Sequence, residues 1–395
     1  MRFQEGWSKV SLSQILELLY GKSLPKSARE DGSYPVYGSN GTVGYHSEFA
    51  VTGPGIIVGR KGSCGEVHYC DSDFWPIDTT YYVNLKRNDN LRFVAYLLSS
   101  LGLNQMNSHS TIPGLNRERV YRLSFPLPPL SEQKKIAAVL LKLQRAIEAQ
   151  ERIIQSLRDL KKSTMQHLFT RGLRGEKTKM TEIGEIPESW DVVRLEDVCS
   201  FLSGGTPRKS HSEFWKGTVP WVSPKDMKKP RLKDAKDHIT EEALNSGSCL
   251  APVRSIFIVV RGMILMKDVP IALTEVPMAF NQDMKAIIPN KQYDPEFLFY
   301  ALQAFKHLLF QKVGRSAHGT RTIISTTLSE FKVPRPCMSE QIQIAASLRI
   351  AEKNTAICES RKACLQSLFK TTLNNLMTGA IRVADIDIDV REVEG

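Results

Sequence analysis

Apolar residues recur at helical spacing along two long stretches of the chain. The first runs from Ser131 to about Thr170 without an intervening Pro or Gly, and as far as Leu157 its apolar residues follow steps of three, four and seven, as in a coiled coil. A helix of about 40 residues is about 60 Å long, more than one compact domain covers, so we expect the two stretches to pack as antiparallel helices. The stripe positions are Ile136, Leu140, Leu143, Ile147, Ile154, Leu157 and Leu168 in the first stretch, and Ile344, Leu348, Leu365, Phe369 and Leu376 in the weaker second one.

The two stretches belong to an internal repeat. FPLPPLSEQ (125–133) returns 208 positions later as VPRPCMSEQ (333–341), and the match continues without a gap for some fifty residues. The prolines should prevent an earlier helix start, so Ser131 and Ser339 are the predicted N-caps. The order of the chain is therefore a globular region, a long helix, a second globular region and a second long helix.

The globular regions contain short β-rich runs and one amphipathic helix each. IIVGR (56–60) and IFIVVR (256–261) are predicted strands, and 93–101 and 297–305 are predicted matching helices. This pattern predicts an α+β fold: two β-rich α/β domains separated by two long antiparallel coiled-coil-like helices, with a pseudo-two-fold internal repeat. The expected segments are 1–128 (first domain), 129–175 (central helix), 176–336 (second domain, with a solvated linker at 171–189), 337–383 (distal helix) and 384–395 (a loose acidic tail).

Composition adds a partner class. The chain has 395 residues with a net charge of +11, and this balance favours a polyanion, most commonly nucleic acid, although surplus surface lysine would give the same number. No signal peptide and no apolar run of about 18 residues is visible, so we expect a cytoplasmic protein without membrane contact. Its seven cysteines are widely spread, which favours reduced thiols.

The sequence offers little catalytic chemistry. Gly21-Lys22-Ser23 resembles the end of a phosphate-binding loop, but the glycine required five positions earlier is Leu16. No methyltransferase, dinucleotide or nucleophile-elbow motif is visible. Cys64, His68 and Cys70 could bind zinc, but their spacing is uncommon for zinc and we prefer a packed strand. We therefore predict no catalytic residue and no metal in this chain.

Basic residues cluster between 200 and 236, interleaved with Trp215 and Trp221, where a solvated charged loop is the alternative to a phosphate-binding surface. The loops 108–119 and 314–321 each precede a long helix and hold matching places. Each candidate taken alone is more often structural or phosphate-facing than base-specific. The DNA-binding candidates are Lys22, Lys26, Arg29, Ser39, Asn40, Arg60, Lys61, Thr79, Thr80, His109 and Asn116 in the first domain, and Arg208, Lys209, Lys225, Lys228, Arg261, Asn281, Gln282, Arg315 and Arg321 in the second.

Four segments carry a resemblance to a known family. PLPPLSEQKKIAAVL (126–140), PRPCMSEQIQIAASL (334–348), IGEIPESWDVVRLEDV (183–198) and LMTGAIRV (376–383) resemble the specificity subunit of type I restriction–modification systems. The resemblance covers nearly the whole chain. Its most specific element is Pro-x-Pro-x-x-Ser-Glu-Gln at the start of a long helix, found twice.

The resemblance implies a non-catalytic subunit that binds double-stranded DNA. Each target recognition domain would read one half of a bipartite asymmetric site. The helices would set the spacing and dock two modification (adenine-N6 methyltransferase) subunits. Leu160, Met165 and Phe169 on the first helix could be docking surface or simply core, and we favour docking for some of them. S-adenosylmethionine, ATP and Mg would be bound by partner subunits, including the restriction (translocase and endonuclease) subunits, and this chain would hold no cofactor.

Two other functions remain open at this point. The chain could be the remnant or specificity part of a fused restriction–methylation enzyme, although it lacks both catalytic motifs. It could also be a coiled-coil scaffold that binds only proteins, against which the basic, β-rich paired domains argue. Salt dependence of duplex binding would separate DNA reading from a scaffold.

Overall fold

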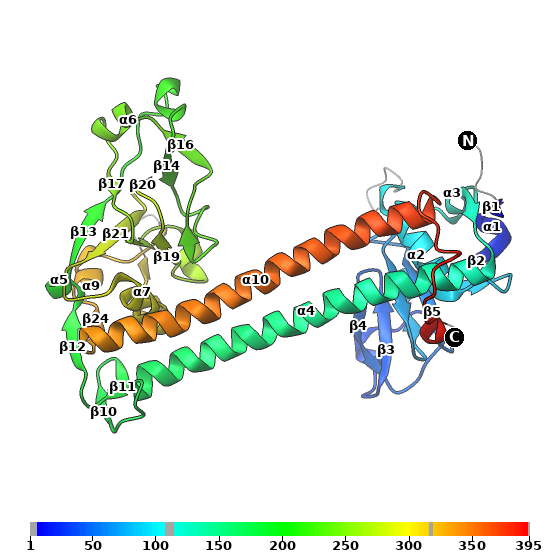
Figure 1. Ribbon diagram of the computed structural model, residues 1–395, viewed down its shortest axis with the longest axis horizontal. Coiled ribbons are helices and arrows are strands. Elements are labelled where there is room, and N and C mark those ends of the chain that lie inside the picture. Colours follow the sequence, from blue (N-terminus) through cyan, green and yellow to red (C-terminus); the bar gives the residue numbers. More distant parts are fainter. Residues whose placement is uncertain (1–5, 107–113, 316–318, 394–395) are drawn as a thin grey trace. The chain divides into compact units, whose positions relative to one another are not determined.

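The computed structural model describes residues 6–106, 114–315 and 319–393. The chain divides into two compact units, Met1–Ile153 with Cys358–Gly395, and Ile154–Ile357. Each unit combines one globular domain with a part of both long helices, α4 (Leu130–Arg171) and α10 (Met338–Met377) (Figure 1). The first unit contains the beginning of α4 and the end of α10, and the second contains the reverse, so the helices are antiparallel as predicted.

The two globular domains repeat one strand order. In each, a larger, mainly antiparallel sheet carries one amphipathic helix, and a smaller sheet contains one parallel pair (Figure 1). The larger sheet of the second domain also ends in a parallel pair. The larger sheet of the first domain has the order β2 (Leu16–Tyr20), β8 (Thr80–Leu85), β5 (Gly55–Gly59) and β6 (Val67–Cys70), with β4 (Gly41–His46), β3 (Tyr34–Gly38) and β7 (Trp75–Pro76) in the smaller one. The second domain has β13 (Cys199–Ser203), β21 (Met284–Pro289), β18 (Ile256–Val259), β19 (Ile271–Thr274) and β15 (Arg231–Leu232), with β16 (Asp237–Ile239), β14 (Val219–Val222), β20 (Met278–Phe280) and β17 (Leu250–Ala251) in its smaller sheet.

The helices and remaining strands follow the same plan. The predicted amphipathic helices are α2 (Leu91–Ser100) and α7 (Pro295–Ala304), and both are largely buried. In each domain a two-stranded antiparallel ladder pairs a strand at the beginning of the domain with one at its end. The matching elements are β1 (Ser8–Ser11), α1 (Leu12–Ile15), α3 (Arg117–Tyr121) and β9 (Ser124–Leu127) in the first unit, and β12 (Asp191–Arg194), α5 (Leu195–Val198), α9 (Ser325–Ser329) and β24 (Lys332–Arg335) in the second. The second unit also contains α6 (Glu241–Asn245), α8 (Lys306–Gln311), β22 (Gly314–Arg315) and β23 (Arg321–Thr322).

The long helices begin one residue before the predicted serine caps, at Leu130 and Met338. The backbone amides of Glu132 and Gln133 both donate to the carbonyl of Pro129, at 2.9 and 3.0 Å. The N-cap prediction for Ser131 and Ser339 is therefore wrong. A proline lacks an amide hydrogen but keeps its carbonyl, so the first helical turn can follow it directly.

The apolar stripe faces inward along both helices. Ile136, Leu140 and Leu376 belong to the core of the first unit, and Leu168, Ile344 and Leu348 belong to that of the second. Ile154 is buried as well. Between these ends the stripe is half-buried, because the domains cover only part of each helix. The half-buried positions are Leu143, Ile147, Leu157, Leu365 and Phe369.

The repeated Ser-Glu-Gln motif has a structural role that its sequence alone does not reveal. The side-chain carbonyl of Gln133 accepts a hydrogen bond of 2.9 Å from the amide of Asn90, the N-cap of α2. Gln341 accepts the equivalent bond of 2.8 Å from Asp294, the N-cap of α7. Each glutamine therefore holds the start of its domain's amphipathic helix against the start of a long helix.

The glutamates of this motif, Glu132 and Glu340, each bind a tryptophan near the beginning of a domain. Glu132 accepts from the indole nitrogen of Trp7 at 2.9 Å, and Glu340 accepts from that of Trp190 at 3.1 Å. Within each unit this bond ties a residue near the beginning of the domain to the first turn of the helix that leaves it. Trp7 corresponds to Trp190 in the sequence repeat, and Glu132 corresponds to Glu340. The repeat therefore already indicated these two pairs.

Two expectations about connecting segments are wrong. The expected solvated linker contains a hairpin, β10 (Thr178–Thr181) and β11 (Gly184–Pro187), whose Ile183 and Ile186 are buried in the core of the second unit. The expected loose tail is folded up to Val393, which is 3% exposed in the core of the first unit. In both segments the isolated isoleucine and valine residues supply burial that the charged composition obscured. Among the described residues, no helix has the length and apolar character needed to cross a membrane.

Candidate nucleic-acid interface

Several candidates of the first domain lie together at one edge of the larger sheet. The amides of Arg60 and Lys61, just past β5, donate to the carbonyl of Thr79 at 2.9 and 3.1 Å. The hydroxyl of Ser39 donates to the same carbonyl at 2.6 Å. The strand end, the turn before β8 and the β3–β4 turn are thereby held together, with Asn40 exposed beside Ser39.

The second domain builds the same edge with different side chains. The amides of Val260 and Arg261 donate to the carbonyl of Asp283 at 2.9 and 3.1 Å. Because these bonds match those of Arg60 and Lys61 to Thr79, Arg261 takes the place of Lys61. The neighbouring Gln282 bonds to the hydroxyl of Thr206, beside the end of β13.

The segments that precede the long helices join this edge in both domains. Leu115 donates to the carbonyl of Arg60 at 2.9 Å, and Ile323 donates to that of Val260 at 2.8 Å. Isolated bridges pair Lys61 with Gly114 and Arg261 with Thr322. The matching positions predicted for these segments are confirmed for their described parts. His109 lies outside the described residues.

Arg60 occupies an aromatic setting. Its guanidinium lies 5.1 Å from the ring centre of Tyr20 and 5.9 Å from that of Tyr81, and it donates to the carbonyl of Asp78 at 2.6 Å. The guanidinium of Arg117 lies 5.2 Å from the centre of the same Tyr20 ring. Burial raises the pKa of Tyr81 to about 12, so its phenol stays neutral beside these cations. The cluster orients one arginine at the edge of the sheet.

Several candidates have structural roles instead. Ser39 and Thr80 are buried, and the hydroxyl of Thr80 donates to the carbonyl of Ile77 at 2.7 Å. Arg29 donates to the carbonyl of Val43 at 2.8 Å, bracing the β3–β4 hairpin. The side chain of Asn116 caps α3. Sheet register and local capping determine these roles, so we remove these four residues from the candidate surface. Lys22, Lys26, Asn40 and Lys61 remain exposed.

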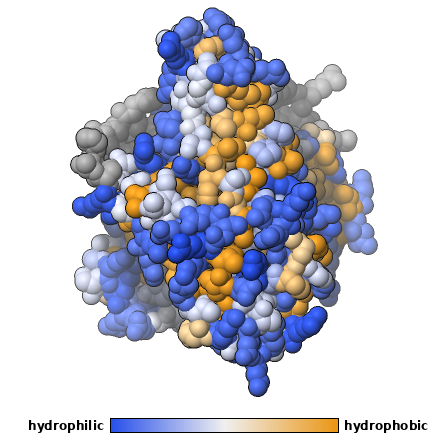
Figure 2. All heavy atoms as spheres, turned by 90° about the vertical axis from the view of Figure 1, so that its left-hand side faces the viewer, coloured by the Kyte–Doolittle hydropathy of each residue, from blue (hydrophilic) through white to orange (hydrophobic). Residues whose placement is uncertain are grey.

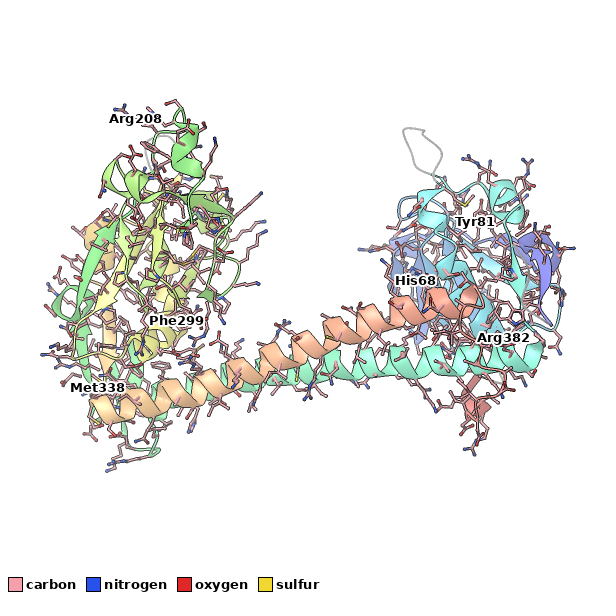
Figure 3. The ribbon with its side chains drawn as sticks, turned by 45° about the horizontal axis from the view of Figure 1, so that its top comes forward. His68, Tyr81, Arg208, Phe299, Met338 and Arg382 are labelled. Atoms are coloured by element: carbon pink, nitrogen blue, oxygen red, sulfur yellow. The ribbon has the colours of Figure 1, made fainter. Side chains whose placement is uncertain are left out.

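The basic segment of the second domain contains a hollow of about 460 Å³. The candidates Lys209 and Lys225 line it together with Trp215 and Trp221, whose ring centres lie 5.0 Å apart in an edge-on arrangement. Lys225 also forms an ion pair of 2.6 Å with Asp237. Arg208 lies at the part of this domain remote from α10 (Figure 3).

The remaining second-domain candidates divide by exposure. Asn281 also borders the hollow, but it is buried and bonds to Asp283 at 3.2 Å, so we assign it a structural role. Arg321 is half-buried and lies opposite Arg315 in the short β22–β23 hairpin. The exposed candidates are Arg208, Lys209, Lys225, Lys228, Arg261, Gln282 and Arg315.

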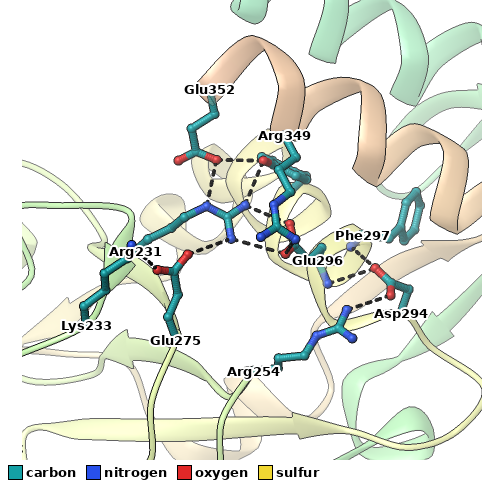
Figure 4. A network of polar contacts seen from close by, with 10 residues as sticks. Arg231, Lys233, Arg254, Glu275, Asp294, Glu296, Phe297, Arg349 and Glu352 are labelled. Carbon is teal, nitrogen blue, oxygen red and sulfur yellow. Dashed lines mark hydrogen bonds and ion pairs between the residues drawn. The ribbon is translucent and has the colours of Figure 1, made fainter. Parts of the chain in front are cut away.

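Arg231, counted within the basic cluster, takes part in a largely buried network of polar contacts (Figure 4). Its guanidinium lies 2.8 Å from the carboxylate of Glu296 on α7 and 3.1 Å from that of Glu352 on α10. Tyr300 donates to Glu352 at 2.7 Å. Burial opposes the charge on Arg231, but the hydrogen bond to Glu296 and the neighbouring carboxylates outweigh it and raise the pKa of Arg231. This residue attaches the basic segment to the long helix.

The cysteine and histidine residues considered for zinc are separated. Cys64 lies before β6 and its thiol contacts the carbonyl of Arg60 at 3.1 Å, whereas the thiol of Cys70 contacts the carbonyl of Ser72 at 3.3 Å. His68 lies in β6 and its ring is 6.2 Å from that of Tyr37. Over residues 6–106, 114–315 and 319–393 we find no group of three or more His, Cys, Asp or Glu residues arranged to hold a metal.

Comparison with known proteins gives one consistent family. The model of the type I restriction modification DNA specificity domain matches residues 4–158 and 187–367. A type I restriction enzyme MjaVIII specificity subunit from Methanocaldococcus jannaschii is 26% identical over 98% of this chain and 96% of its own length. The EcoR124I/EcoR124II specificity subunit from Escherichia coli is 38% identical, but this match spans 39% of each chain.

Solved structures agree in fold. The S subunit of a type I restriction–modification system from M. genitalium superimposes with a TM-score of 0.66 over 95% of this chain and 98% of that one, at 18% identity. A chain from a structure concerning complex assembly and conformational transition of the type I R-M system gives a TM-score of 0.55 over 96% of this chain and 100% of that one, at 16% identity.

Proposed function

Because the chain belongs to the type I restriction modification DNA specificity domain family, we propose that it is the non-catalytic subunit that reads DNA for such a system. Each globular domain binds one half of a bipartite site on double-stranded DNA. The observation that carries this proposal is the duplicated sheet edge, where a strand end, a turn and the segment before a long helix meet through the same backbone hydrogen bonds in both domains.

The site should be asymmetric because the two edges differ chemically. Where the first domain places Arg60 and Lys61 next to Thr79, the second places Val260 and Arg261 next to Asp283. Arginine pairs with guanine more readily than lysine does through a bidentate contact, and a carboxylate can accept from the amino group of cytosine. Equivalent backbones that carry different side chains read different bases.

The long helices supply the spacing between the half-sites and dock two modification subunits, which methylate adenine. Exposed apolar residues on the helix surfaces fit such docking, including Leu160 of α4 and Ile350 and Leu368 of α10. Figure 2, which faces the side of the second unit, shows that apolar residues also lie exposed between polar ones on this unit. Phe169 is not available for docking because it packs in the core of the second unit, and Met165 packs against that core.

Partner subunits complete the activity. The modification subunits would bind S-adenosylmethionine, and the restriction subunits would use ATP and Mg for translocation and cleavage, so this chain needs no cofactor of its own. A complex that acts on genomic DNA would work in the cytoplasm. Its affinity for DNA depends on lysines and arginines that neutralise phosphates, and this makes binding strongly dependent on salt.

The test is to sequence methylated adenines in a host that carries this chain with its modification subunits. We expect a split, asymmetric motif with a fixed gap, and the absence of such a motif would refute the proposal. A salt titration of duplex binding by the assembled complex distinguishes a protein-only scaffold, for which affinity would not fall steeply with salt.

The spacing role has its own test. Inserting seven residues into each long helix at matched positions lengthens the pair by about 10 Å, or about three base pairs. We expect the gap in the methylated motif to lengthen while both half-sites stay the same. An unchanged gap in a methylating complex would show that the helices do not set the spacing.

A further inference from the structure

The turn that follows β18 exposes three large apolar side chains within four residues. The 3-10 turn Met263–Met266 leaves Met263 61%, Ile264 42% and Met266 52% exposed. Leu265 between them is 1% exposed and anchors the turn in the core. Single exposed apolar residues are ordinary on protein surfaces, but a contiguous group indicates a contact surface.

This apolar turn is bordered by arginines. The amide of Gly262 donates to the carbonyl of Arg321 at 3.0 Å, and Arg321 lies opposite Arg315 in the β22–β23 hairpin. Arg261 lies two residues before Met263, and its guanidinium is 4.0 Å from the carboxylate of Asp283. The basic surroundings of the turn complement a polyanion rather than a basic or neutral partner.

The first domain lacks this feature at the equivalent place. After β5 its chain continues through Lys61, Gly62 and Ser63 to Cys64, which is 3% exposed. The backbone crossing is the same in both domains, so the fold does not require exposed apolar side chains here. Their presence in the second domain is therefore not a requirement of the shared backbone.

We propose that Met263, Ile264 and Met266 contact 5-methyl groups of thymine in the major groove of the half-site that the second domain reads. The inference rests on the proposed function. Each thymine presents a methyl group at its major-groove edge, where apolar side chains can make contact and exclude water. The neighbouring arginines would contact guanines or phosphates at the same time. Methionine and arginine also favour protein interfaces, and a protein partner is the alternative that the test must exclude.

The test removes one methyl group at a time from the DNA. Deoxyuridine replaces each thymine in a duplex that carries the site found by methylation sequencing, and affinity is measured with the full chain in its complex. We expect at least one replacement in one half-site to weaken binding about fourfold, the equivalent of one buried methyl group. The combined variant Met263→Ser, Ile264→Ser, Met266→Ser should lose this sensitivity in that half-site only.

The control is Met180→Ser, which changes a 79% exposed methionine on β10 of the same unit and should retain the sensitivity. Insensitivity of the wild-type complex to every replacement would overturn the inference, as would a triple variant that stays fully sensitive. A triple variant that binds DNA normally but no longer assembles with its modification subunits would show a protein-docking surface instead. If the wild-type complex does not bind the intact site at all, the proposed function itself fails.

Discussion

The carboxylate of Glu132 lies 2.7 Å from the guanidinium Nε of Arg382, which follows the other long helix by five residues. Glu132 also accepts from the indole of Trp7, and the Arg382 guanidinium lies 5.4 Å from the centre of that ring. Three distant segments of the first unit therefore meet at one buried carboxylate. The second unit has the glutamate and the indole, and there the backbone amide of Leu173 donates to Glu340 at 3.1 Å.

Replacement of Arg382 by methionine should destabilise the first unit by about 3 kcal/mol, because it leaves a buried carboxylate without its charged partner. The control is Arg361→Met, at an exposed position on α10 that should change stability by less than about 0.5 kcal/mol. Chemical denaturation of the full chain measures both. Equal stability of the two variants would contradict the structural role of the pair.

The same carboxylate predicts a pH dependence. Burial alone would raise the pKa of Glu132, but the hydrogen bonds from Arg382 and Trp7 outweigh it, and the pKa is lowered. A lowered folded-state pKa contributes stability above the unfolded-state value of about 4.3, and this contribution is lost as pH falls through the folded value. Glu132→Gln should therefore flatten the acid side of the stability profile, as measured by denaturation between pH 6 and 3. A parallel loss of stability in variant and wild type would contradict this assignment.

Removal of the buried side chain at the end of the chain should weaken the first unit. Val393→Ala removes methyl groups from a position that is 3% exposed, and should cost about 1–3 kcal/mol. Ile386→Ala, at an exposed position of the same segment, should have little effect. Thermal unfolding of the two variants measures the difference, and equal melting temperatures would mean that the segment does not contribute to the core.

Arg231 and Lys228 should separate stability from DNA binding, although they are three positions apart. Arg231→Met removes the guanidinium that pairs with Glu352 and one of the two that pair with Glu296, and should destabilise the second unit by about 3–5 kcal/mol. Lys228→Met changes an exposed lysine; it should leave stability unchanged, weaken binding of all duplexes alike and lower the salt slope by about one. Denaturation curves and salt titrations of both variants test this, and a stable Arg231→Met protein would contradict the network's role.

Phe169 and Leu160 make a matched pair on α4. Phe169 packs against Trp190, Phe297 and Phe305, so Phe169→Ala should cost about 3–5 kcal/mol of stability. Leu160 is exposed, and Leu160→Ala should leave the fold intact but weaken assembly with the modification subunits. Denaturation measures the first effect and co-purification the second. A Leu160→Ala protein that assembles normally would remove this residue from the docking surface.

The elements of the fold that depend on local spacing of apolar residues, or on the repeat, could be predicted from the sequence. Helical spacing of Ile136 and Leu140 identified a long helix, and its repetition at Ile344 and Leu348 identified the second. Short β-rich runs located β5 and β18, since both are continuous apolar strands. The repeat also placed the segments before the long helices correctly, because equal positions in two copies of one fold occupy equal places.

Packing between residues that are distant in the sequence could not be predicted from local patterns. Nothing near Thr80 or Asn281 indicates that these polar side chains are buried, because the sheet register decides which way each one points. Arg231 looked like its basic neighbours, but carboxylates distant in the sequence, Glu296 on α7 and Glu352 on α10, bind its guanidinium. The Val393 position likewise depends on the distant Asn90, which donates to its carbonyl.

The division of the chain has a consequence for biosynthesis. The second unit is continuous from residue 154 to residue 357, whereas the first needs residues 358–395 in addition to its opening 153. A ribosome delivers the chain from its N-terminus, so the second unit has all its residues available before the first can be completed. The globular domain of the first unit is translated first but would stay incomplete until residues 358–395 leave the ribosome. Until then, the core positions that contact Leu376 and Val383 would be uncovered.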